Sequence, residues 1–159
     1  MSHNWRSAFL AQARSDFRIL EILSLRQGVE RCHCLHYLQM AAEKLAKAFL
    51  TKGAAQPQTT HHVLVRFLRR AETVRELQRA CRTQSVAQFR QYLKGLMSVA
   101  QEVEALVPQK NSVRPNPEYP WVESGVIHAP CEYAFPGWPG DAPKLIKIKS
   151  FIRVCLQQA

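Results

Sequence analysis

The residues best suited to hold a ligand lie in a proline-rich segment at 111–121. The segment offers a guanidinium, an amide, a carboxylate and two aromatic rings at close spacing, namely Arg114, Asn116, Glu118, Tyr119 and Trp121. Aromatic faces can stack a nucleobase, and a guanidinium can contact its phosphate. The interspersed prolines restrict the backbone, so the sequence predicts a rigid binding loop. In the alternative interpretation the two rings fill a groove on the protein, and the loop is structural.

Basic side chains are the next candidates. Lys44 and Lys47 lie with Glu43 on the polar side of a stretch with helical periodicity. They are candidates for phosphate contacts, and the alternative is a solvated helix face. The densest basic stretch follows, with few aromatic residues between its arginines: Arg66, Arg69, Arg70, Arg75, Arg79 and Arg82. We expect it to attract a polyanion without reading a nucleotide sequence.

Histidines and cysteines gather at two places, which raises the question of a metal site: Cys32, His33, Cys34, His36, His61 and His62. Cys32 and His36 share a helix face at four-residue spacing, but no tight ligand motif accompanies them. Glycine-rich phosphate loops, Ser/His/Asp arrangements and informatively spaced carboxylate pairs are absent from the sequence. We therefore expect neither a metal nor a cofactor.

Composition indicates a single domain of 159 residues with 22 Lys and Arg against 12 Asp and Glu, a net charge of +10. This excess favours a polyanionic partner such as RNA, DNA, a nucleotide or an acidic protein. No apolar run has transmembrane length, and the N-terminus lacks a signal pattern. The five cysteines have no framework spacing and fit reduced thiols. We expect a cytoplasmic protein without a membrane partner.

Hydrophobic periodicity predicts an all-α fold, an up-and-down bundle of four main helices plus a C-terminal helix. The expected helices cover about 4–26, 31–52, 60–79 and 85–107, with the last beginning near 141. Thr59 or Thr60 can cap the third helix, Ser85 the fourth and Asp141 the last, which has Pro143 in its first turn.

Residues 108–143 have a different character, since eight of the nine prolines of the chain lie here among aromatic residues. So much proline excludes a continuous helix, and so many aromatic residues argue against disorder. We expect an ordered insertion that packs on the bundle within one domain, 1–159. Short extended pieces at 122–127 and 131–135 could pair with each other.

The sequence of the second expected helix and of the segment after it resembles that of a known protein family. The run QMAAEKLAKAFL at 39–50, followed by Gly53 and by Thr60-His61, closely resembles the central helix and following loop of HEPN domains. Ala13 and Asp16 stand where that family often has an alanine and an aspartate. The resemblance covers roughly the first half of the chain. It implies a small helical bundle, a homodimer and a place in prokaryotic defence, toxin–antitoxin or nucleotide-handling systems.

The resemblance also raises the question of ribonuclease activity. Many HEPN proteins cleave RNA without metal by a late motif, an arginine followed about four to six residues later by a histidine, which suits proton transfer and phosphorane stabilisation. Arg31 and His36 have this spacing, but they lie on the second helix, about 140° apart around its axis. Arg114 precedes His128 by too many residues. The sequence therefore predicts an atypical HEPN-like protein without a well-placed ribonuclease motif and names no catalytic residue.

Three functions follow in order of preference. The first is a binding module for RNA or a nucleotide in a defence or toxin–antitoxin system, using the basic face and the Arg114–Trp121 loop. The second is an interaction or dimerisation subunit of a larger effector with a protein partner. The third is a divergent metal-independent ribonuclease that uses one of three histidines with one of two arginines: His36, His61 or His128 with Arg31 or Arg114.

Overall fold

The structure is a computed structural model that describes residues 4–51, 59–108, 114–138 and 142–159. It is mostly helical, as the sequence predicts, with seven α-helices and one small sheet in these residues. The helices are α1 (Trp5–Ser24), α2 (Arg31–Leu50), α3 (Leu64–Ala71), α4 (Arg75–Ala80), α5 (Val86–Lys94), α6 (Met97–Glu104) and α7 (Pro143–Gln157). No helix among the described residues is both long and apolar enough to cross a bilayer.

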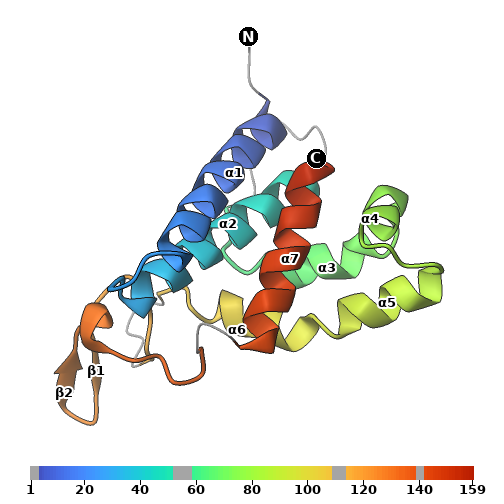
Figure 1. The fold of residues 1–159 in the computed structure, drawn as a ribbon. Helices are drawn as coiled ribbons and strands as arrows, with labels where there is room; N and C mark the ends of the chain where they lie inside the picture. Colours follow the sequence, from blue (N-terminus) through green and yellow to red (C-terminus); the bar gives the residue numbers. More distant parts are fainter. Residues whose placement is uncertain (1–3, 52–58, 109–113, 139–141) are drawn as a thin grey trace.

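Helix α2 is the centre of the fold. It packs along α1 and also contacts α3, α6 and α7, so it is covered on most sides (Figure 1). Ala13 on α1 and Ala41, Ala42 and Ala46 on α2 are completely buried, and their small side chains let neighbouring helices approach closely. The start of α1 is fixed by Asn4, whose Oδ1 accepts from the backbone N–H of Ser7 at 2.9 Å.

The third and fourth helices of the sequence prediction are each two helices. The expected cap at Thr59 or Thr60 is wrong, because α3 begins after Val63 without a side-chain cap. The cap at Ser85 is confirmed, since its Oγ accepts from the N–H of Gln88. The α-helical backbone is interrupted at Gly95, between α5 and α6. There the N–H of Leu96 donates to the carbonyl of Leu93, three residues back instead of four. Glycine is a poor helix former, while the buried stripe continues on both sides of the break.

The insertion contains a hairpin. Strand β1 (Trp121–Glu123) pairs antiparallel with β2 (Val126–His128), and a 3-10 turn, η1 (Pro130–Glu132), follows. The two loop residues, Ser124 and Gly125, have φ values of 51° and 80°, as a two-residue hairpin turn requires. The expected pairing of 122–127 with 131–135 is therefore wrong, because the first segment folds back on itself.

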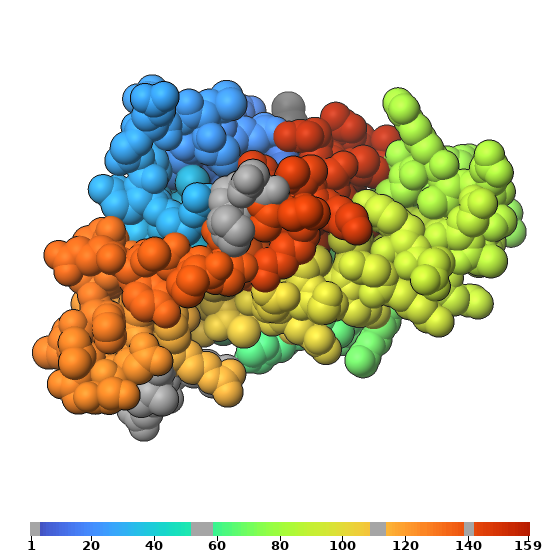
Figure 2. Space-filling model, turned by 60° about the horizontal axis from the view of Figure 1, so that its bottom comes forward, coloured from blue at the N-terminus to red at the C-terminus, as the bar shows by residue number. Residues whose placement is uncertain are grey.

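Helix α7 closes the bundle by packing on α1, α2, α4 and α6. Pro143 occupies the predicted first turn, and Asp141, the predicted cap, lies outside the described residues. The hairpin and the region of α4 and α5 lie at opposite ends of the molecule (Figures 1 and 2).

Candidate functional site

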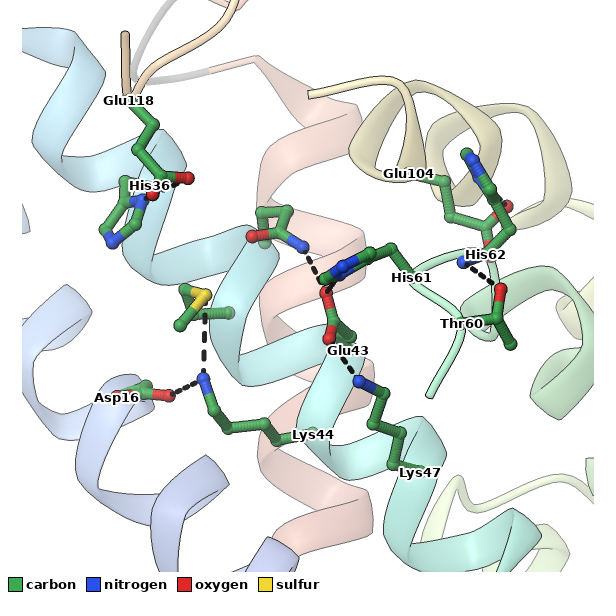
Figure 3. Close-up of polar contacts among 12 residues, drawn as sticks. Asp16, His36, Glu43, Lys44, Lys47, Thr60, His61, His62, Glu104 and Glu118 are labelled. Atoms are coloured by element: carbon green, nitrogen blue, oxygen red, sulfur yellow. Dashed lines mark hydrogen bonds and ion pairs between the residues drawn. The ribbon is translucent and has the colours of Figure 1, made fainter. Parts of the chain in front are cut away.

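Within the described residues, three polar side chains converge on Glu43 of α2 (Figure 3). Its carboxylate receives Gln39 Nε2 at 2.8 Å, Lys47 Nζ at 2.6 Å and His61 Nδ1 at 2.9 Å. The glutamine and the lysine lie one helical turn before and after Glu43, so their side chains meet on one face of α2. His61 comes from the segment that precedes α3.

Glu43 is ionised in this setting. Burial is the largest influence on its pKa and raises it, but the hydrogen bonds and charges of Lys47 and His61 together outweigh burial and lower the pKa. An ionised carboxylate only accepts hydrogen bonds. It therefore holds a proton on Nδ1 of His61.

His61 is the residue best placed for proton transfer. Its side chain is 59% exposed, whereas Glu43 is 9% exposed. A carboxylate that engages Nδ1 fixes the tautomer of an imidazole and leaves Nε2 as the proton acceptor. The pair therefore has the chemistry of a general base with an orienting carboxylate.

Lys44 forms a second ion pair, partly buried between α1 and α2. Its Nζ lies 3.0 Å from Asp16 Oδ2, and Gln12 donates to the other carboxylate oxygen at 2.9 Å. The interpretation of Lys44 and Lys47 as a solvated helix face is therefore wrong. Each lysine faces a carboxylate, which compensates its charge and weakens its attraction for a phosphate.

The side chains of the predicted binding loop lie in different environments. Asn116 is buried, and its Oδ1 accepts the backbone N–H groups of Glu118 and Tyr119 at 3.1 and 2.8 Å. The Glu118 carboxylate lies 4.0 Å from Nδ1 of His36 (Figure 3). Tyr119 is exposed, and the hydrogen bond of its hydroxyl to Glu118 raises its pKa. Asn116 thus shapes the turn that presents the other two side chains.

Trp121, the first residue of β1, has a buried side chain that is 3% exposed. Its ring stacks on His128 with centroids 5.4 Å apart and meets Tyr133 edge-on at 4.9 Å. This ring fills an internal aromatic cluster, so the alternative interpretation, in which both rings fill a groove, holds for the burial of Trp121 and is wrong for the exposed Tyr119. Arg114 instead lines a cavity of about 310 Å³ together with Trp138 and other residues of the insertion.

The largest concentration of positive charge covers α3, α4 and α5, residues 64–94, which we call the basic lobe. It carries eight exposed basic side chains: Arg66, Arg69, Arg70, Arg75, Arg79, Arg82, Arg90 and Lys94. Glu72 and Glu76 are its only acidic residues, and Glu72 pairs with Arg90 at 3.0 Å. The lobe extends the arginine-rich stretch of the sequence by one further helix.

Other chemistries have less support. Among the residues that the structure describes, no group of three or more His, Cys, Asp or Glu side chains could hold a metal ion. Burial raises the pKa of Cys81 to about 11 and also raises that of Cys155, which makes both thiols poor nucleophiles.

No family model, no curated protein sequence and no solved structure matches this chain. The HEPN resemblance therefore depends on the residues of α1, α2 and the loop after α2 that are quoted above.

Proposed function

We propose that this protein is an RNA-binding module that holds RNA on the basic lobe. The observation that carries the proposal is the exposure of eight basic side chains over three successive helices, with only two acidic residues among them. Helix α5 alone, with its nine residues, is about 13 Å long. The lobe therefore suits a chain of phosphates better than a single nucleotide. The preference for RNA over other polyanions comes from the HEPN resemblance.

The lobe offers mainly flexible cations and few aromatic rings. Contacts of this kind position a phosphate backbone but carry little sequence information. Binding is therefore expected to be salt-sensitive and tolerant of sequence. The setting implied by the resemblance is part of the proposal: a homodimer and a protein partner within a prokaryotic defence or toxin–antitoxin system.

Fluorescence anisotropy with labelled single-stranded RNA across a salt series tests the proposal. For a single strand, each phosphate contact contributes about −0.7 to the slope of log K against log salt. The double variant Arg69→Gln/Arg79→Gln should make the slope shallower by about 1.4, because it removes two such contacts. Arg18→Gln/Lys147→Gln is the matched control, since it removes the same charge from exposed positions on α1 and α7, outside the lobe.

Two results would overturn the proposal. One is the absence of RNA binding by the wild-type protein at low salt, which would favour the interaction-subunit alternative. The other is an equal loss of affinity in the control variant, because net charge alone would then explain binding.

A second function, metal-independent cleavage of the bound RNA, is favoured by the His61–Glu43 pair. In this reaction His61 Nε2 accepts the proton of a ribose 2′-hydroxyl, and the 2′-oxygen attacks the adjacent phosphorus. The bond from phosphorus to the 5′-oxygen breaks, and that oxygen takes a proton from solvent. The products are a 2′,3′-cyclic phosphate and a 5′-hydroxyl.

Cleavage assays in EDTA test this second function. His61→Ala should lower the rate at least about 100-fold, the usual size of a general-base effect, while RNA binding persists. His62→Ala is the control, because His62 is similarly exposed at 56% and lies 3.9 Å from a different carboxylate, Glu104. A wild-type protein that binds RNA without cleaving it would refute the second function and leave the first intact.

A further inference from the structure

A cleft of about 390 Å³ lies between the α1–α2 connection and α7, away from the basic lobe. Three cationic side chains line it, those of Arg26, Arg31 and Lys149. Its remaining lining includes aliphatic side chains: Leu20, Leu23, Leu25, Val29, Leu35 and Leu145. Among the described residues, no carboxylate lines this cleft.

The turn between α1 and α2 brings the two arginines to the cleft. Gly28 has a φ of 76°, a left-handed conformation that glycine adopts without strain, and it reverses the chain between them. Lys149 joins them from α7, where its Nζ donates to Ser24 Oγ at 3.1 Å.

Positive charge dominates the lining of this cleft. Neither Arg26 nor Arg31 has an ion-pair partner within the described part of the chain. Burial lowers the pKa of Lys149, and the charge of Arg153 adds to the decrease, while Cys34 and Glu21 oppose it. Glu30 at the N-cap position of α2 makes no side-chain cap, and its carboxylate lies 3.6 Å from Nε2 of His33 and does not line the cleft.

We propose that this cleft binds a small phosphate-bearing molecule through Arg26, Arg31 and Lys149. One guanidinium group can donate two hydrogen bonds to two oxygens of the same phosphate. Three cations suit a dianionic phosphate better than a singly charged carboxylate. The aliphatic residues provide a surface for the organic part of the ligand. They offer no aromatic ring, so recognition of a stacked nucleobase is not expected. The proposal is independent of RNA binding, since the cleft shares no residue with the basic lobe.

Isothermal titration with pyrophosphate, supported by thermal unfolding, tests the proposal. Wild-type protein should bind one pyrophosphate per chain and gain thermal stability at constant ionic strength. Arg31→Gln/Lys149→Gln should weaken binding by at least about tenfold, since hydrogen bonds to charged groups contribute this much or more. Without ligand this variant should unfold at the same or a higher temperature, because it removes like charges from one cleft.

The basic-lobe variant Arg69→Gln/Arg79→Gln serves as the matched control and should keep full pyrophosphate affinity. If it loses that affinity instead, the anion occupies the lobe and the proposal is wrong. The absence of heat and of stabilisation with wild-type protein at 10 mM pyrophosphate would also overturn it. Phenylphosphate should bind more tightly than inorganic phosphate if the leucines contact the organic part, and equal affinities would contradict that role.

Discussion

Replacing Glu43 by glutamine tests whether the charge of this side chain stabilises the buried cluster on α2. The substitution keeps the shape of the side chain but removes its charge. It leaves Lys47, whose side chain is 10% exposed, without an anionic partner 2.6 Å away. Breaking a buried pair by removing one partner costs about 3–5 kcal/mol. Since glutamine keeps one acceptor oxygen, we expect about 3 kcal/mol, which for a chain of this size lowers the Tm by about 6–12 °C.

Urea unfolding followed by circular dichroism measures this loss, with Glu76→Gln as the control at an exposed glutamate of α4. The control should stay within about 0.5 kcal/mol of the wild type. The difference caused by Glu43→Gln should also depend on pH. Because the native pKa of Glu43 is lowered from its ordinary 4.5, its contribution is complete above that value and is lost as the pH falls through the native pKa. A loss below 1 kcal/mol at pH 7, or a difference that persists in acid, would show that the charge of Glu43 does not stabilise the fold.

Three further predictions concern other parts of the fold. Lys44→Met should destabilise the protein by about 2–4 kcal/mol in the same urea assay, because it leaves the buried carboxylate of Asp16 unpaired; a loss under 1 kcal/mol would contradict this ion pair. Trp121→Ala should cost about 3–5 kcal/mol by removing the centre of the aromatic cluster, and an unchanged unfolding midpoint would place that ring at the surface. Cys131 is exposed whereas Cys155 is buried with a raised pKa, so a thiol reagent should label Cys131 first, as peptide mass spectrometry can show, and the opposite order would be inconsistent with this fold.

The bounds of the three longest helices could be predicted closely from the sequence. Helices α1, α2 and α7 carry continuous apolar stripes, and their bounds lie within a few residues of the prediction. The breaks at Gly95 and after Ala71 were missed because the apolar spacing continues across them, and periodicity does not detect a local tightening of the backbone. The hairpin turn did have a local signal, the dipeptide Ser124-Gly125.

The functional groups were harder to predict because their partners are distant in the chain. Helical spacing places Lys47 beside Glu43, but it does not reveal that His61 completes the cluster or that Asp16 on α1 faces Lys44. Trp121 is a residue type that often stacks on a ligand, and only the packing of its ring against His128 and Tyr133 shows that it is internal.

Binding of RNA to the basic lobe can be tested by comparing two proteins. The affinity of single-stranded RNA for the wild-type protein and for Arg69→Gln/Arg79→Gln is measured at 50 and 200 mM salt. We expect strong salt dependence in the wild type and a clearly smaller dependence in the variant. Identical salt dependence in the two proteins would show that RNA binds elsewhere than on the basic lobe.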